Sequence, residues 1–457
     1  MSARGKRGSG GIRYWDPEDD EFWRRTGRRT AMRNLAFSIL AEHVGFSVWS
    51  LWSVLVLFLG PEYGLSPADK FLLVSTPTLV GAVLRIPYTL AVGWFGGRTW
   101  TVLSATVLLV PVLLAAVYLR PGTSLGTLLL VSAVAGLGGG NFASSMANIN
   151  AFFPQRHKGW ALGLNAGGGN LGVAVTQLAA LAVLGTVGAA EPRLLLGVFV
   201  PAIVVAAVCA ALYMDDLPGH RNDTDALRDV LRDAHCWVMS LLYLGTFGSF
   251  IGYCFAFGLV LQTQFDRTPL QAASLTFLGP LLGSLTRPGG GWLADRIGGA
   301  RVTFAVFVAL MLCTGVAVVA SRTDSLRLFV ADFVVLLALS GAGNGSTYKM
   351  IPAIFRMKAL QDGGGDEGDA ITRERLSRAR RLSGALIGVT GAVGALGGVL
   401  INLAFRASFA GWGSGIPAFT GFLVFYAVCA TVTWAAYLRR RPRRRTRASA
   451  PDVVLSV

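Results

Sequence analysis

The stretch GAVLRIPYTL, residues 81–90, lies within a longer apolar run over 70–94 and carries one arginine, Arg85, near its centre. A helix of about 20 apolar residues is long enough to span the hydrocarbon layer of a membrane. A fixed positive charge at the centre of such a helix costs about 2.5–3.5 kcal/mol on insertion scales. Because the charge is costly, we expect Arg85 to serve the function of this helix.

The rest of the chain repeats the apolar pattern. It has 457 residues, of which 53% are hydrophobic and 14% charged, and its mean hydropathy is +0.55. Soluble domains usually carry about 25% charged residues. We therefore predict an all-α integral membrane protein with twelve spans, over 34–59, 70–94, 99–119, 125–152, 159–186, 193–214, 236–262, 269–294, 302–320, 327–352, 383–405 and 416–437.

The spans fall into two groups of six. The polar segment 215–235 separates them and predicts two six-helix bundles, over 34–214 and 236–437. Such an arrangement is typical of transporters built from two repeats. A second long polar segment, 353–382, interrupts the second bundle and predicts a mobile loop on the same side as 215–235, with a surface helix within it as an open alternative.

Basic residues predict the orientation. The net charge is +16, and most of the 41 lysines and arginines lie in the tails 1–33 and 438–457 or in loops on the same side as the tails. Cytoplasmic segments of membrane proteins carry such an excess, so we expect both termini inside the cell. The sequence RRRPRRRTR, residues 439–447, is interpreted as an anchor to the membrane surface rather than a nucleic-acid site.

A second intramembrane arginine echoes the first. The second predicted span ends RIPYTLAVGWFGGR (85–98), and the eighth ends TRPGGGWLADRIGGAR (286–301). When the two are aligned on Gly-Trp, Arg85 and Arg287 differ by four residues, which is about one helical turn. Both could thus face one central cleft from opposite bundles. Few intramembrane carboxylates can neutralise them, so the pair predicts an anion site. The alternative to an anion site stays open: backbone carbonyls at helix breaks could accept the hydrogen bonds of both arginines.

Glycine is concentrated in three of the predicted spans. These are AGLGGGNFASSMANINAFFP (135–154), GWALGLNAGGGNLGVAVTQL (159–178) and GALIGVTGAVGALGGVLIN (384–402). Small residues let helices approach closely, and we expect the runs to form a tightly packed, mobile gate. The candidate gating residues are Asn141, Gly163, Asn165, Gly167, Gly168, Gly169, Gly172, Gly388, Gly391, Gly394, Gly397 and Gly398.

Titratable residues within the spans are candidates for proton coupling. Glu42 and His43 lie in the first span, and Lys349 lies near the end of the tenth. Intramembrane ionisable groups are functional candidates, and histidine is suited to proton transfer. The alternative to proton coupling is that Glu42 and His43 lie near water at the inner end of the first span, with Glu42 bridging to Lys349. The five cysteines show no metal or disulfide spacing, so we expect no metal and no cofactor.

Several motifs resemble one known family. YWDPEDDEFWRR (14–25), LRIPY (84–88), GNFASSMANINAFFPQRHKGWALGLNAGGGNLGV (140–173) and GNGSTYKMIPAIF (343–355) are similar to segments of the nitrate/nitrite porters of the major facilitator superfamily. The resemblance implies the major facilitator fold, two pseudo-symmetric six-helix bundles. LADRIGGAR (293–301) resembles the loop motif of the superfamily, whereas its counterpart GWFGGRTW (93–100) lacks the acidic residue, which puts an ion pair at that loop in doubt.

The resemblance also implies roles for individual residues. Arg85 and Arg287 match the paired arginines that bind the anion, and Asn170 matches an asparagine that donates a hydrogen bond to it. The aromatic positions implied for the pocket are Phe142, Phe46, Tyr253 and Phe257.

We therefore predict a nitrate/nitrite transporter of the inner membrane that works by alternating access as a monomer, with proton-coupled nitrate uptake. Its expected partners are nitrate, nitrite, H⁺ and the lipid bilayer, and not nucleic acid. The alternatives are nitrate/nitrite antiport without protons, a carrier for another solute, and a nitrate sensor that does not transport. We do not expect an enzyme, because no nucleophile–base or metal spacing surrounds His157 or His220.

Overall fold

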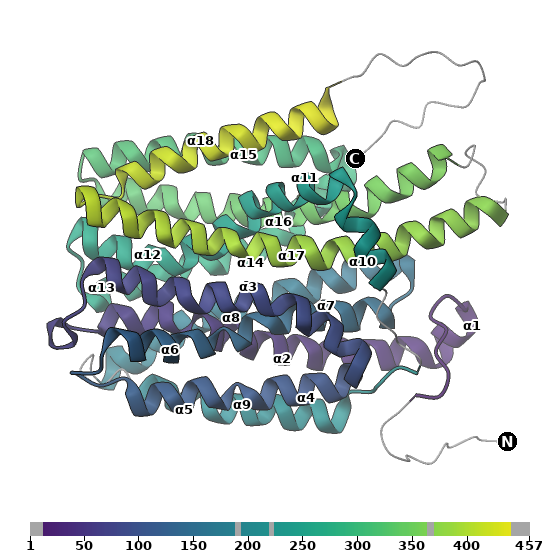
Figure 1. Ribbon diagram of the computed structural model, residues 1–457, viewed down its shortest axis with the longest axis horizontal. Coiled ribbons are helices and arrows are strands. Elements are labelled where there is room, and N and C mark those ends of the chain that lie inside the picture. The colour runs from purple at the N-terminus through teal and green to yellow at the C-terminus, as the bar shows by residue number, and fades with distance from the viewer. Residues whose placement is uncertain (1–11, 188–192, 219–223, 363–369, 440–457) are drawn as a thin grey trace. The chain divides into compact units, whose positions relative to one another are not determined.

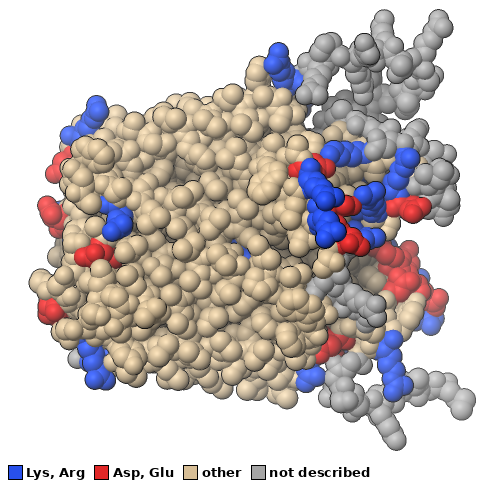
Figure 2. All heavy atoms as spheres, viewed as in Figure 1, with Lys and Arg blue, Asp and Glu red and all other residues tan. Residues whose placement is uncertain are grey.

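The computed structural model describes residues 12–187, 193–218, 224–362 and 370–439. All elements of these residues are helical, so the predicted all-α class is confirmed. The chain divides into two compact units, and Figure 1 shows long helices lying side by side within each. On the face drawn in Figure 2, Lys, Arg, Asp and Glu gather at the helix ends, and the stretch between them is almost free of charge.

Unit 1 comprises residues 1–223 together with 268–277. Its helices are α1 (Asp20–Phe22), α2 (Arg28–Leu55), α3 (Pro67–Phe95), α4 (Gly97–Val107), α5 (Leu109–Tyr118), α6 (Leu125–Ala135), α7 (Leu137–Phe152), α8 (Gln155–Val187), α9 (Leu194–Tyr213) and α13 (Pro269–Thr276), with short helices η1 (Trp23–Gly27), η2 (Val56–Phe58) and η3 (Pro61–Tyr63).

Unit 2 comprises residues 224–267 and 278–457. Its helices are α10 (Thr224–Leu231), α11 (Ala234–Tyr243), η4 (Leu244–Gly248), α12 (Ser249–Phe265), α14 (Leu278–Ile297), α15 (Gly299–Arg322), α16 (Leu326–Asp362), α17 (Ala370–Trp412), α18 (Ile416–Thr433) and η5 (Trp434–Leu438). The predicted domain boundaries at 34–214 and 236–437 stay a prediction.

Eleven of the helical segments in the described residues are long and apolar enough to cross a membrane. The predicted span 269–294 is not among them. Its helix is divided at Phe277 into α13 and α14. Pro280 explains the break: it has no N–H to donate to the carbonyl of Thr276, the last residue of α13. Pro111 explains in the same way why α4 ends at Val107.

Most of the predicted loop 353–382 is helical. α16 continues to Asp362 and α17 begins at Ala370, so both helices extend beyond the predicted spans. The acidic Gly-rich part, 363–369, and the basic sequence 440–447 lie outside the described residues. The prediction took charged residues for a loop, but charged side chains on a helix that leaves the membrane are solvated and do not end it.

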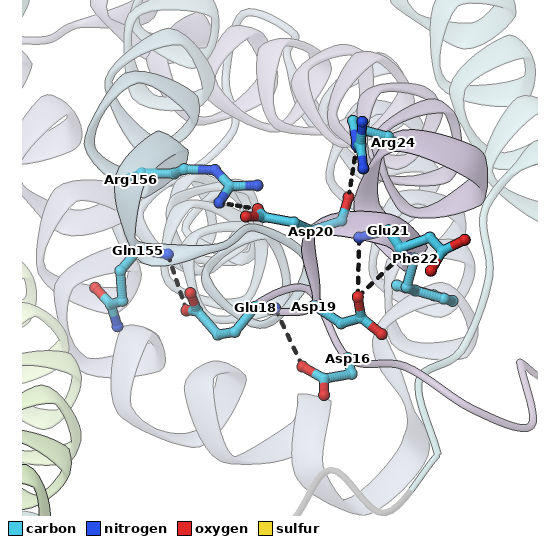
Figure 3. A network of polar contacts seen from close by, with 9 residues as sticks. All are labelled: Asp16, Glu18, Asp19, Asp20, Glu21, Phe22, Arg24, Gln155 and Arg156. Carbon is cyan, nitrogen blue, oxygen red and sulfur yellow. Dashed lines mark hydrogen bonds and ion pairs between the residues drawn. The ribbon is translucent and has the colours of Figure 1, made fainter.

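The N-terminal segment 12–27 folds onto the turn between α7 and α8. The Oε1 atom of Glu18 accepts a hydrogen bond of 3.0 Å from the N–H of Gln155, the first residue of α8, and Asp20 pairs with Arg156 (Figure 3). Asp19 caps α1 through the N–H groups of Glu21 and Phe22. The segment is thus held by charge-assisted hydrogen bonds at the end of the bundle where α2 and α8 begin.

Glycines let α3, α7 and α2 approach to backbone contact. A Cβ atom at Gly139 of α7 would lie 2.8 Å from the Cα of Gly81 and 2.7 Å from the indole ring of Trp49. That indole is fixed in turn, because its Nε1 donates to the carbonyl of Pro77 at 2.8 Å. Neither the Gly81 backbone nor the fixed Trp49 indole can move without a substantial energetic cost, so position 139 requires glycine.

We predict that Gly139→Ala destabilises the protein by about 1–3 kcal/mol, the usual cost of overpacking a tight core. Gly163→Ala in α8 is the matched control, because a Cβ there meets nothing within 4 Å. The midpoint of thermal unfolding in detergent should fall for Gly139→Ala and stay the same or rise for the control. Equal midpoints for the two variants would contradict the packing argument.

Candidate functional site

Arg85 is fully buried in unit 1 and lies against aromatic rings. Its guanidinium carbon is 4.5 Å from the ring centroid of Phe142 on α7 and 5.6 Å from that of Trp49 on α2. Its Nε donates to the carbonyl of Gly139 at 3.3 Å. The ring of Phe46 lies edge-on to Phe142 at 6.0 Å between centroids. The structure therefore brings together three of the predicted residues, Arg85, Phe142 and Phe46, and adds Trp49; we call these four the Arg85 cluster.

Arg287 is the corresponding buried cation of unit 2. One of its amino groups, Nη2, donates to the hydroxyl of Tyr243 at 3.3 Å, and its guanidinium carbon is 5.4 Å from the ring centroid of Tyr348. The rings of Tyr243 and Tyr348 are 4.8 Å apart. The other amino group, Nη1, is buried and has no hydrogen-bond partner in the described part of the chain. These three residues form the Arg287 cluster.

The backbone packing that places Arg287 repeats that of Arg85. The backbone carbonyl of Arg287 packs directly against Gly345 of α16, and a Cβ atom on Gly345 would come within 2.7 Å of the amide nitrogen of Gly291. The helices α14 and α16 are thus in backbone contact, as α3 and α7 are. Each arginine-bearing helix also ends at a glycine with positive φ, Gly96 at 89° and Gly298 at 95°.

Buried asparagines accompany both clusters. Asn170 on α8 and Asn141 on α7 are buried in unit 1, and Asn344 on α16 is buried in unit 2. Neither the nitrogen nor the oxygen of these three amides has a hydrogen-bond partner among the described residues. An unsatisfied buried amide costs about 1–3 kcal/mol, and a cost repeated in both units indicates a polar function. Such groups can donate to a small anion without adding charge.

Sequence reasoning missed three residues here: Tyr243, Tyr348 and Asn344. Tyr348 and Asn344 lie in GNGSTYKM (343–350), whose Gly-Asn pair repeats the Gly140-Asn141 pair of α7. That repeat was the signal available for Asn344. Tyr243 carries no such signal, because it lies where α11 passes into the π-helical turn η4, which shifts the register of the helix.

Tyr253 and Phe257, predicted as pocket aromatics, lie in an aromatic cluster of unit 2. Tyr253 accepts a hydrogen bond from the hydroxyl of Tyr426 at 2.9 Å. Its ring lies 5.3 Å from that of Phe333, and Phe257 stacks on the same ring at 4.3 Å. The structure therefore brings these two residues together through Phe333, whereas the rings it places on Arg287 are those of Tyr243 and Tyr348.

Glu42 lies at the centre of a buried polar network. Its Oε2 accepts hydrogen bonds from the Ser145 hydroxyl at 2.6 Å and from Nδ2 of Asn165 at 2.7 Å, and Ser145 also contacts Ser38. Asn165, predicted as a gating residue, thus binds the predicted proton-coupling residue.

The other two proton-coupling candidates have different surroundings. A ring nitrogen of His43, Nδ1, lies 3.0 Å from the carbonyl of Gly168. Lys349 pairs with Asp295 at 2.7 Å, and its side chain is 37% exposed. Glu42 and Lys349 therefore each have partners within their own unit.

The predicted gating glycines have different surroundings. Gly168, Gly169 and Gly172 pack against residues of α2, and Gly394 and Gly397 pack against α11 and η4. Gly163 and Gly167 have open space where a Cβ would lie. The remaining ones, Gly388, Gly391 and Gly398, lie on α17.

The first loop motif obtains its acidic group from elsewhere. Asp216, which follows α9, accepts hydrogen bonds from the N–H of Arg98 at 2.8 Å and from the hydroxyl of Thr99 at 3.0 Å. These residues open α4, so the carboxylate caps that helix. GWFGGRTW lacks an acidic residue, which put an ion pair at this loop in doubt; the contacts that Asp216 makes here are hydrogen bonds to a backbone N–H and a hydroxyl. No group of three metal-ligand side chains occurs within the described ranges.

Helices of this length with two buried arginine clusters define a multi-pass membrane transporter. A model of the Major Facilitator Superfamily matches residues 37–359. A solved structure, a bacterial homolog of the human lysosomal transporter Spinster, aligns with a TM-score of 0.62 at 17% identity, covering 88% of this chain and 96% of its own. At this identity the likeness concerns the fold alone.

Comparison with named relatives places the chain more narrowly within the class of transporters. The nitrate/nitrite transporter NarU of Salmonella typhimurium is 38% identical, with 94% of this chain and 97% of the relative covered. NarU of Escherichia coli is 36% identical over 94% and 96%, and the probable nitrate/nitrite antiporter NarK2 of Thermus thermophilus is 32% identical over 94% and 97%. The chain belongs to the nitrate/nitrite porter family of the Major Facilitator Superfamily. The predicted family is confirmed, as is the prediction of a transporter rather than an enzyme.

We predict that the acceptor oxygen of Glu42, rather than its charge, stabilises the fold. Glu42→Gln keeps an oxygen for Ser145 and Asn165, whereas Glu42→Ala leaves both donors unsatisfied and should cost about 1–3 kcal/mol. Thermal unfolding in detergent should therefore show a lower midpoint for the alanine variant and a nearly unchanged one for the glutamine variant. Equal losses in both would assign the stabilisation to the negative charge.

Proposed function

We propose that this protein carries nitrate and nitrite across the membrane by alternating access around one anion site to which Arg85 and Arg287 both contribute. The observation that carries the proposal is that each unit buries one arginine against an aromatic ring. Asn170, Phe142 and Phe46 belong to the proposed site, to which the clusters add Tyr243 and Tyr348. Tyr253 and Phe257 remain proposed pocket residues.

The chemistry of the clusters suits a small planar anion. A guanidinium presents parallel N–H donors that match two oxygens on one edge of nitrate or nitrite. Aromatic faces accept a flat ion and disfavour strongly hydrated, tetrahedral ones. Relatives with coverage above nine tenths are named as nitrate/nitrite transporters, which supports nitrate and nitrite as the substrates.

The transport cycle follows from the charge. Without an anion, two buried cations would oppose closure of the bundles. Binding removes this penalty, so occlusion should follow binding. The proposed architecture is twelve spans in two pseudo-symmetric six-helix bundles, with both termini in the cytoplasm and the monomer as the working unit in the inner membrane.

Proton coupling is the proposed mode of nitrate uptake, with Glu42 as the proton-carrying group. Its burial on α2 and its hydrogen bonds to α7 and α8 support this role, because a proton there would change contacts among three helices. His43 and Lys349 remain weaker candidates. Exchange of nitrate for nitrite without protons is the second candidate, favoured by the antiporter name of the Thermus thermophilus relative.

We predict that Arg85→Lys and Arg287→Lys each lower nitrate uptake into proteoliposomes about tenfold to a hundredfold. Lysine keeps the charge but loses the planar fork, and a hydrogen bond to a charged group is worth about 1.5–3 kcal/mol. Arg301→Lys is the matched control, because Arg301 is exposed and, among the described residues, donates only to the carbonyl of Ile297; it should keep wild-type uptake. Full activity of both cluster variants would refute recognition by paired guanidinium groups.

We predict that a pH gradient, acidic outside, drives nitrate into proteoliposomes that contain no internal nitrite. In Glu42→Gln this uptake should disappear, while exchange of internal nitrite for external nitrate persists. The two assays, run on the same preparation, separate the loss of coupling from the loss of anion binding. Uptake that strictly requires internal anion in the wild type would replace proton symport by antiport.

A further inference from the structure

A cavity of about 800 Å³ lies in unit 1 at the end where α2 and α8 begin. Three arginines line it, Arg24, Arg28 and Arg156, together with His157 and the rings of Trp23 and Trp160. This volume lies within the range of small-molecule sites, about 300–1,000 Å³. The cavity is separate from the Arg85 cluster, which lies near the middle of α3.

The lining carries an excess of positive charge. Arg156 pairs with Asp20 (Figure 3), and Arg24 donates through Nε to the carbonyl of Asp20 at 3.3 Å. Neither Arg24 nor Arg28 forms an ion pair within the part of the chain that the structure describes. None of the described residues that line the cavity is acidic. Among these residues, the guanidinium charges of Arg24 and Arg28 therefore have no counter-ion.

The walls are rigid enough to form a defined site. Trp23 is buried, stacks on His157 at 5.9 Å and lies edge-on to Phe153 at 5.7 Å. The N–H of Gln155 donates a hydrogen bond to Glu18, which ties the N-terminal segment to the start of α8. Stacked rings and a capped helix start thus fix the positions from which the arginines extend.

Exposed apolar side chains at the start of two candidate membrane spans line part of the cavity. Met32 on α2 and Trp160 on α8 also line it and are 38% and 56% exposed. Both helices continue directly into membrane-crossing segments. Exposed tryptophan next to a span is typical of the membrane interface, and basic pockets between spans bind anionic lipid headgroups.

We propose that this cavity binds the phosphate of an anionic phospholipid headgroup, with Arg28 and Arg24 contacting the phosphate and Met32 and Trp160 contacting the adjoining chain. The ligand is a phosphate monoanion on an apolar stem. Free phosphate shares the charge but not the stem, so the two sources can be separated by experiment.

The test titrates phosphatidylglycerol into the purified full-length protein in neutral micelles and follows the thermal unfolding midpoint. Phosphatidylglycerol should raise the midpoint, whereas phosphatidylcholine should not. Arg28→Gln should raise the half-saturating phosphatidylglycerol concentration about fivefold, and Arg24→Gln with Arg28→Gln roughly 25-fold, as expected for basic residues that each contribute about 1 kcal/mol. Arg29→Gln, an exposed neighbour outside the lining, is the matched control and should match the wild type.

Each alternative result overturns the assignment. Equal lipid dependence in Arg28→Gln and Arg29→Gln would mean that only general surface charge attracts the lipid. An equal midpoint shift by inorganic phosphate in lipid-free micelles would make free phosphate the ligand. If Arg28→Gln alters the midpoint without lipid, Arg28→Lys provides the second variant: it keeps the charge without the fork and should bind more weakly than the wild type.

Discussion

Burying a guanidinium is the constraint from which the rest of this structure follows. Arginine stays protonated in proteins, so each unit must supply contacts that tolerate a charge inside a membrane bundle. Arg85 has the Phe142 ring and the Gly139 carbonyl, and Arg287 has the Tyr348 ring and the Tyr243 hydroxyl. A cation–π contact is worth about 0.5–2 kcal/mol, less than the cost of burying the charge. The contacts orient each guanidinium, and the proposed function assigns the anion as the further partner of both charges.

The first role of the glycines is to allow the close helix packing around each buried guanidinium. Gly139 both supplies the carbonyl that accepts from Arg85 and lacks the Cβ that would push α7 away from α3. Gly345 likewise lacks the Cβ that would push α16 away from α14, because it packs against the backbone carbonyl of Arg287. The glycine runs therefore have a packing role wherever they meet another helix. A role in movement remains best suited to positions such as Gly163 and Gly167, which face open space.

Sequence reasoning could reach the parts of the site that are local in sequence. Arg85 carried a signal in its own segment, a charge in an apolar run, whereas Phe142 and Phe46 were implied by the family resemblance. The hydroxyl that binds Arg287 depends on the register across a π-helical turn, which no periodicity in the sequence reveals, so Tyr243 was not predicted. The break at Phe277 was predictable from Pro280, but hydropathy alone joined the two halves of that span. Asp216 could not be foreseen at the first loop, because 118 residues separate it from Arg98.

Asp216 also connects parts of unit 1 that are distant in sequence, which an acidic residue within the loop motif itself would not do. Its carboxylate caps α4 directly after the helix of Arg85, while its carbonyl accepts a hydrogen bond from Ile12 at 3.1 Å. From Ile12 the chain continues to Glu18, which binds the start of α8, the helix that carries Asn170. In unit 2 the corresponding acid, Asp295, lies within its own motif and pairs with Lys349. The N-terminal segment therefore links the ends of the two helices that hold Arg85 and Asn170, and a change in how it docks would reach both helices together.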